Sequence, residues 1–288
     1  MDIDVLGALA VRENGISITP TAPKPRQVLA LLALHADQVV PVSALIEELW
    51  AGAPPRSART TLQTYVLQLR ALIANALEQG ARADTGSENG TPGAGRGRRT
   101  AKDVLVTLPG GYLLDSGGGV SDVREFERLS GMGYRAMDAG DFPGAARQLR
   151  DALSLWSGPA FADVHGGIQL DMETRRLEET RLCALDQRIE ADLRLGRHRE
   201  LLAELTVLAS RYRTHENLHG QFMLALHRSG RRSEALDVYQ RLRATLVREL
   251  GLEPSAALRR LQRSILMAGP ESPLEAPEAN GERLVRVG

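Results

Sequence analysis

The chain has almost no cysteine and no excess of charge of either sign. Cys183 is the one cysteine among 288 residues, which excludes a disulfide framework within the chain and favours a reducing, cytoplasmic environment. Its neighbours are apolar and helix-forming, so we expect a small buried side chain and not a nucleophile. Lys plus Arg and Asp plus Glu both number 36, so no overall field draws the whole chain to nucleic acid or to a membrane.

Membrane segments and catalytic motifs are missing as well. The N-terminus MDIDVLGALAV lacks the basic region of a signal peptide, and no apolar run approaches the roughly 20 residues of a membrane span. There is no phosphate loop, G-x-S-x-G, H-E-x-x-H or paired-cysteine motif. His215 and His219 lie four residues apart, but without a third ligand they read as ordinary surface or inter-repeat histidines. We therefore expect no enzyme, no cofactor, no bound metal and no membrane partner.

Acidic residues are also absent from Ala51 to Leu77, and the chain is organised around this stretch. The spacing of Leu62, Val66, Leu69 and Ile73 forms one apolar stripe and predicts a helix over Pro54–Ala74. Two prolines, Pro54 and Pro55, end whatever precedes this helix, and Ser57 is its expected N-cap.

The opposite face of this helix carries short hydrogen-bonding side chains and cations. Thr60, Thr61, Thr64 and Gln68 lie on it, and Arg56, Arg59 and Arg70 flank it. A face of this kind suits a helix lying in the major groove of DNA. The alternative is a solvated face that merely lacks carboxylates, and the helix alone does not decide between the two.

The neighbouring segments supply the rest of a winged helix. The order is a small hairpin, three helices and a second hairpin, the wing. The expected elements are a β-prone stretch Asp2–Val11 with a turn at Glu13–Gly15 and a strand Ile16–Ile18, helices Arg26–His35 and Ala44–Ala51 (N-cap Ser43), an extended connector Val39–Pro41, and strands Val104–Leu108 and Tyr112–Leu114 around Pro109–Gly111.

A low-complexity stretch lies between the third helix and the wing. Its Gly, Ala, Thr, Ser and Asn content predicts a disordered insert over about residues 79–102. Between Pro54 and Lys102 there are eight basic and three acidic residues, a local excess of five positive charges. This charge is concentrated where a contact with DNA would lie.

After Gly117–Gly119, which marks an expected domain boundary, the sequence becomes helical. GRHRELLAEL from Gly196 and GRRSEALDVY from Gly230 match at an offset of 34 residues, the tetratricopeptide period, and Ala139–Trp156 has a similar pattern. A plain helical bundle is the alternative. The predicted domains are 1–116 (winged helix), 120–268 (repeat domain) and 269–288 (disordered tail).

Several segments, taken together and in order, resemble one family of transcriptional activators. In the first part they are VLGALAV, the helix start Lys24-Pro25-Arg26, LIEELWAG, TTLQTYVLQLR and LPGGYLL. In the second part they are DVREFERL, GDFPGAARQLRDALSLWSGPAFADV, ETRRLEETRLCALD and LVRELGLEPSAALRRLQRSIL. On these motifs the chain is similar to the small members of the Streptomyces antibiotic regulatory protein family. The resemblance covers roughly residues 1–268. It implies a mainly α fold with small β elements, in which an OmpR-type winged helix precedes a tetratricopeptide-like bacterial transcriptional activator domain.

The same resemblance implies roles for individual residues. Base edges would be contacted by Thr61, Thr64 and Gln68, although Gln68 stands where the wider OmpR-like family often has arginine, which leaves its base preference open. The expected phosphate contacts are Arg59, Thr60, Tyr65 and Arg70 on the helix and Arg56 just before it, and the expected wing contacts are Gly110, Gly111 and Tyr112. Tyr65 and Tyr112 have an alternative role as packing residues.

For function, the resemblance implies an activator of a secondary-metabolite (antibiotic) gene cluster. We expect it to bind direct repeats in promoter DNA, as a dimer on the DNA, and to recruit RNA polymerase holoenzyme at the nucleoid. Larger family members append nucleotide-binding domains, and since this sequence ends before them we expect no ATP-dependent switch. The alternative is a tetratricopeptide-like scaffold whose winged helix binds protein; the acid-free third helix argues against it.

Overall fold

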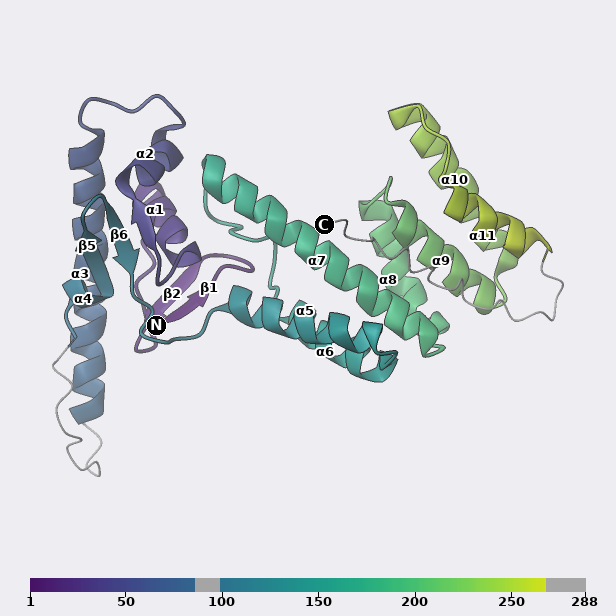
Figure 1. Cartoon of the computed structure of the whole chain (residues 1–288), viewed down its shortest axis with the longest axis horizontal. Helices are drawn as coiled ribbons and strands as arrows, with labels where there is room; N and C mark the ends of the chain where they lie inside the picture. Colours follow the sequence, from purple (N-terminus) through teal and green to yellow (C-terminus); the bar gives the residue numbers. More distant parts are fainter. Residues whose placement is uncertain (86–98, 268–288) are drawn as a thin grey trace, which may run out of the picture. The chain divides into compact units, whose positions relative to one another are not determined.

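The computed structural model describes residues 1–85 and 99–267 (Figure 1). The chain forms two compact units. The first ends at Gln187 and the second begins at Arg188, so the boundary falls within helix α7 (Ile168–Arg194). The boundary between the compact units is therefore not at Gly117–Gly119, where the change in composition led us to expect a domain boundary. The sequence-based domain limits remain a prediction, and the expected tail after residue 268 lies outside the described residues.

The chain opens with a three-stranded antiparallel sheet. Its strands are β1 (Asp2–Asp4), β2 (Ala10–Glu13) and β3 (Ile16–Ser17), in that order. Asn14 and Gly15 form the turn between β2 and β3 with φ of 52° and 76°, the positive values that an Asn-Gly turn favours. The predicted hairpin is present, and β1 adds a third strand to it.

Three helices and a wing follow, and together they form a winged helix. A second antiparallel sheet joins β4 to the wing strands in the order β4-β6-β5, so the predicted extended connector is itself a strand. The elements are α1 (Pro23–Leu34), β4 (Val39–Pro41), α2 (Val42–Trp50), α3 (Ala58–Thr85), α4 (Ala101–Val104), β5 (Leu105–Leu108) and β6 (Gly111–Leu114).

Two local expectations need correction. Helix α2 begins directly after Pro41, which occupies the N-cap position without a side-chain bond, so Ser43 is not its cap. Helix α3 continues to Thr85, because Ala76 is buried and Gly80 lies against Asn14 of the first sheet. Disorder from residue 79 is therefore wrong for residues 79–85, and it is also wrong for 101–102, which begin α4. Residues 86–98 lie outside the described part of the chain.

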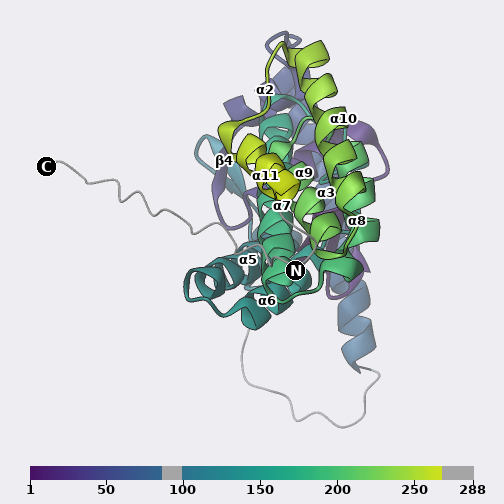
Figure 2. The ribbon, with the colours of Figure 1, turned by 90° about the vertical axis from the view of Figure 1, so that its right-hand side faces the viewer.

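Residues 122–267 are mainly helical (Figures 1 and 2). Within them a helix–glycine–helix unit recurs. Gly140, Gly196 and Gly230 join successive helices with φ of 74°, 78° and 81°, values at which a side chain would be strained. This repetition is the tetratricopeptide-like arrangement that the 34-residue period predicts. The helices are α5 (Asp122–Asp138), α6 (Phe142–Ser154), α7, α8 (His198–Arg211), α9 (Glu216–Arg228), α10 (Arg232–Leu250) and α11 (Ala256–Met267).

In the first unit the winged helix shares one hydrophobic core with α5, α6 and most of α7. The core runs without a break from Ile3 to Ala184. Phe126 of α5 meets the Trp156 ring edge-on, with centroids 5.4 Å apart. Backbone bonds add to this packing, since Ser157 and Phe161 donate their N–H groups to Leu6 and Val5, each at 2.9 Å. The fold therefore presents α3 and the wing from a single compact unit, Met1–Gln187.

Candidate nucleic-acid interface

Helix α3 has the two faces that its sequence predicts. Leu62, Val66, Leu69 and Ile73 are buried in the core of the first unit, and α3 packs against α1 and α2. The helix begins at Ala58, and the carbonyl of Ser57 accepts the N–H of Thr61 at 2.9 Å. Packing of the apolar stripe thus fixes which side chains face solvent.

The predicted base-reading residues lie on the solvent side. Thr64 and Gln68 are exposed, and Thr61 is half-buried at the edge of the face. Thr64 Oγ1 donates to the carbonyl of Thr60 at 3.1 Å, so its hydroxyl hydrogen is used within the helix. Thr64 therefore offers its methyl group and an acceptor oxygen to a ligand, and not a hydrogen-bond donor.

The N-terminus of α3 is well suited to phosphate. Arg56, Arg59 and Thr60 are exposed there, and the first turn carries no acidic side chain. The unpaired N–H groups and the helix dipole at an N-terminus favour an anion. Both arginines and the threonine are thus placed where a phosphate contact was expected.

Arg70 takes a different place from the one predicted. Its Nε and Nη2 donate to the carbonyl of Leu105 at 3.1 and 2.7 Å, and Nη2 also donates to Thr107 Oγ1 at 2.7 Å. The guanidinium therefore ties α3 to the wing strand β5. These bonds indicate that Arg70 positions the wing, and its predicted contact with phosphate stays a prediction.

The wing residues also divide into two kinds. Gly110 has a φ of 84° with nothing within 4 Å of an added side chain, so it forms the open tip of the hairpin. Gly111 is needed for strand pairing, because a Cβ there would lie 2.6 Å from the Val40 carbonyl oxygen. Tyr112 is 7% exposed and Tyr65 packs partly buried against the core, which favours the packing alternative for both.

Four basic residues lie shortly before the wing: Arg96, Arg98, Arg99 and Lys102. Those that the structure describes supply less free charge than their number indicates. Arg99 pairs with Asp115 at 2.9 Å and with Glu13 at 3.7 Å, so its charge is compensated within the protein. Lys102 is exposed on α4, while Arg96 and Arg98 lie outside the described residues. The local excess of five charges therefore overstates what DNA would meet.

A buried carboxylate that joins the winged helix to α7 was not apparent from the sequence. Glu48 of α2 is 2% exposed, and its side chain accepts the backbone N–H groups of Gly167, Gln169 (2.9 Å) and Leu170 (3.3 Å). It thus caps the first turn of α7 from the neighbouring element. Gln27 Nε2 donates to the same carboxylate at 3.1 Å.

A second buried carboxylate joins α5 to the segment that follows β1. Asp122, at the start of α5, accepts the N–H groups of Val5 and Leu6, both at 2.7 Å. Burial raises the pKa of Asp122 despite these bonds. Together the two carboxylates fasten the winged helix to the helices that follow it.

The remaining titratable candidates do not form a reactive site. Cys183 is exposed, which corrects the expectation of burial, and partial desolvation with the nearby Glu179 and Asp186 raises its thiol pKa, which disfavours the thiolate. His215 is the N-cap of α9, where Nδ1 accepts the N–H of Leu218 at 3.3 Å. Within the described ranges, no three His, Cys, Asp or Glu side chains gather as a metal site, and no helix is long and apolar enough to cross a membrane.

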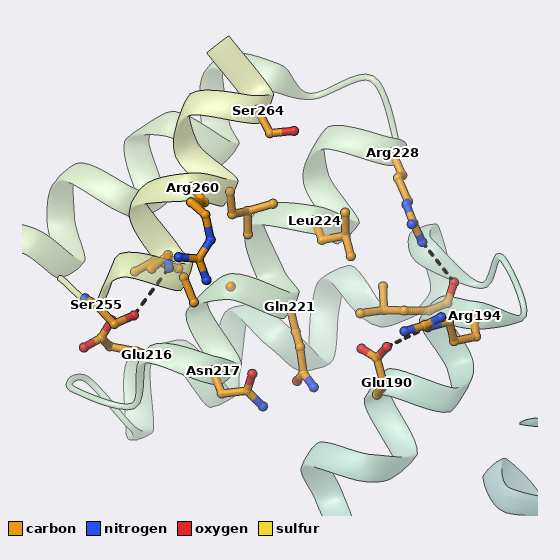
Figure 3. A pocket seen from close by; sticks show the side chains of 15 residues that line it. Glu190, Arg194, Glu216, Asn217, Gln221, Leu224, Arg228, Ser255, Arg260 and Ser264 are labelled. Atoms are coloured by element: carbon orange, nitrogen blue, oxygen red, sulfur yellow. Dashed lines mark hydrogen bonds and ion pairs between the residues drawn. The ribbon is translucent and has the colours of Figure 1, made fainter. Parts of the chain in front are cut away.

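The second unit carries a groove of about 640 Å³ between the end of α7, α9 and α11 (Figure 3). Charged side chains form its rim: Arg194 Nε donates to Glu190 at 2.7 Å, and Arg228 Nη1 donates to the Leu193 carbonyl at 3.3 Å. Desolvation lowers the pKa of Arg228. The apolar lining comes from Leu193, Leu224, Leu258 and Leu261. Stacked helix pairs commonly leave such a groove for a partner.

Comparisons with known proteins agree with this architecture. The family model "Bacterial transcriptional activator domain" matches residues 121–266, and "Transcriptional regulatory protein, C terminal" matches residues 17–86. The chain is 53% identical over 278 residues to Regulatory protein DnrI of Streptomyces peucetius, covering 96% of both chains. It is 34% identical over 267 residues to Regulatory protein AfsR of Streptomyces coelicolor, covering 92% of this chain and 24% of AfsR.

A solved structure is similar as well. It is described as Mycobacterium tuberculosis EmbR in complex with low affinity phosphopeptide, and it matches with a TM-score of 0.79 at 31% identity. The match covers 95% of this chain and 66% of the EmbR chain, so this chain spans just under two thirds of that structure.

The fold, the exposed surface of α3 and the comparisons together define the class of this protein. It is a transcriptional regulator with an OmpR-type winged helix and a bacterial transcriptional activator domain. Within this class, the chain belongs to the Streptomyces antibiotic regulatory protein family of transcriptional activators. The predicted fold class and family are confirmed.

Proposed function

We propose that the chain binds double-stranded promoter DNA through the exposed face of α3 and activates a secondary-metabolite (antibiotic) gene cluster. The observation that carries this proposal is the face itself. It lies in the same compact unit as the wing, is lined by threonine, glutamine and arginine, and is free of carboxylates from Ala51 to Leu77. Membership in a family of transcriptional activators supports the same assignment.

One winged helix is too small for tight operator binding by itself, since single modules bury only about 600–1,000 Å² on DNA. We therefore propose that two copies occupy direct repeats about one helical turn apart. The activator domain would then recruit RNA polymerase holoenzyme, and the groove of the second unit is a candidate surface for such a protein partner.

A mobility-shift titration tests DNA binding most simply. The full chain is mixed with duplexes from the promoter regions next to its own gene, at several salt concentrations. Arg59→Ala should weaken binding to all duplexes alike and reduce the salt slope by about one unit, because it removes one phosphate contact. Gln68→Ala should keep the slope and cost about 1–3 kcal/mol at one base pair.

The two variants serve as controls for each other, because both side chains are exposed on the same helix. Equal effects of the two on salt slope and on sequence preference would contradict the division between phosphate and base contacts. Absence of any preferred duplex would contradict the proposed function itself and favour a protein-binding winged helix.

A further inference from the structure

One large apolar side chain stands on the proposed DNA-binding face. Leu67 is 63% exposed, although it lies within the helix whose other stripe builds the core. Successive residues turn by about 100° in an α-helix, which places Leu67 on the same side as Thr60, Thr64 and Ala71 and opposite Leu62 and Leu69. Leu67 therefore lies near the centre of the exposed face and not at its edge.

The neighbours of Leu67 extend this apolar character along the helix. Thr64, three residues before it, has its hydroxyl hydrogen committed to the Thr60 carbonyl at 3.1 Å and so presents a methyl group. Ala71, four residues after it, is exposed and adds another. The centre of the face is thus a strip of methyl groups, Thr64–Leu67–Ala71, with Gln68 beside it.

Single exposed leucines are common on protein surfaces, so exposure alone decides nothing. The placement is what matters here. A strip of methyl groups on the part of α3 that carries no carboxylate, up to Leu77, has a specific counterpart in the major groove. This counterpart is the 5-methyl group of thymine, which the other bases of unmodified DNA lack. Nothing else at a base edge offers an apolar surface of this kind.

We propose that Leu67 is a specificity-determining residue that reads the 5-methyl group of a thymine in the major groove. This inference rests on the proposed DNA binding by α3. Thr64 and Ala71 flank the contact, so the thymine lies between the bases that Thr64 and Gln68 address. A protein surface that covers Leu67 instead is the rival occupant, and the test separates the two.

The experiment replaces thymine by deoxyuridine, which removes the methyl group and leaves the pairing unchanged. A duplex is first selected by the full chain from a random-sequence pool, and each thymine of its consensus is then replaced in turn. For the wild-type chain, one replacement in each half-site should weaken binding about fourfold, the affinity equivalent of one buried methyl group. Leu67→Ala alters both copies on the two repeats, so binding to the unmodified duplex should weaken by the square of that factor, about sixteenfold. The same thymine replacement should then have no further effect.

Two further variants complete the test. Leu67→Met keeps an apolar group in reach and should retain sensitivity to deoxyuridine. Leu250→Ala removes a comparably exposed leucine (54% exposed) from α10 in the second unit. This variant should change neither the affinity for the duplex nor the effect of deoxyuridine.

The outcomes are distinguishable from failure of the proposed function. If no duplex is selected, DNA binding itself is refuted. If a duplex is selected but lacks thymine in its consensus, or if the loss on deoxyuridine replacement persists in Leu67→Ala, the role of Leu67 is refuted while DNA binding stands. Unchanged DNA binding by Leu67→Ala, accompanied by loss of transcription activation in vitro, would refute it in favour of a protein contact.

Discussion

Replacing Glu48 by alanine should destabilise the contact between α2 of the winged helix and the start of α7. The buried carboxylate of Glu48 accepts three backbone N–H groups in the first turn of α7 and the amide of Gln27. Hydrogen bonds to a charged partner contribute about 1.5–3 kcal/mol each, and desolvation of the carboxylate in the native state offsets part of the sum. We therefore expect a loss of about 3 kcal/mol in the free energy of unfolding of the first unit.

Differential scanning calorimetry of the full chain measures this loss. For a unit of 187 residues, Met1–Gln187, one kcal/mol corresponds to about 2–4 °C, so its Tm should fall by about 6–12 °C. Glu47→Ala is the matched control, because Glu47 is the adjacent residue on α2 and is exposed. A shift no larger than that of Glu47→Ala would show that the carboxylate does not hold α7, and the reasoning would fail.

Two further variants test the other contacts of the first unit. Arg70→Ala should weaken DNA binding through the wing and lower the Tm by a few degrees, because the Leu105 carbonyl and Thr107 lose their hydrogen-bond donor. An unchanged Tm with a reduced salt slope would show that Arg70 contacts phosphate and does not position the wing. Asp122→Asn should change the pH dependence of stability. Since burial raises the pKa of Asp122 in the folded chain, the unfolded chain loses the proton first as the pH rises, and the wild-type free energy of unfolding falls between the two pKa values. The wild-type free energy minus that of the variant should therefore decrease from acidic to neutral pH in denaturant titrations, and a constant difference would contradict the shift.

Sequence periodicity was sufficient for the elements that bury a continuous stripe. The apolar spacing of Leu62 to Ile73 predicted the face of α3 that packs, and the glycines at the 34-residue offset predicted the turns of the helical repeats. Both signals are local, because they depend on residues a few positions apart on one element.

What the sequence could not predict depends on contacts between distant segments. Glu48 and Gly167 are far apart in sequence, and nothing around Glu48 distinguishes it from the exposed Glu47. We expected Arg70 to be an unpaired cation, because its partners on β5 lie 35 and 37 residues further along the sequence. Low complexity suggested disorder from residue 79, whereas α3 continues to Thr85 and its Gly80 lies against Asn14, in the turn between β2 and β3.

The most direct test of the central claim is the affinity of the full chain for its selected duplex after a carboxylate is placed on the exposed face of α3. Thr64→Glu leaves the buried stripe intact, so the Tm should stay near that of the wild-type chain. If α3 lies in the major groove, fluorescence anisotropy should show loss of specific binding at physiological salt, since the new charge faces phosphates and base edges. Specific binding at wild-type affinity would contradict the account and would place the DNA-binding surface elsewhere on the protein.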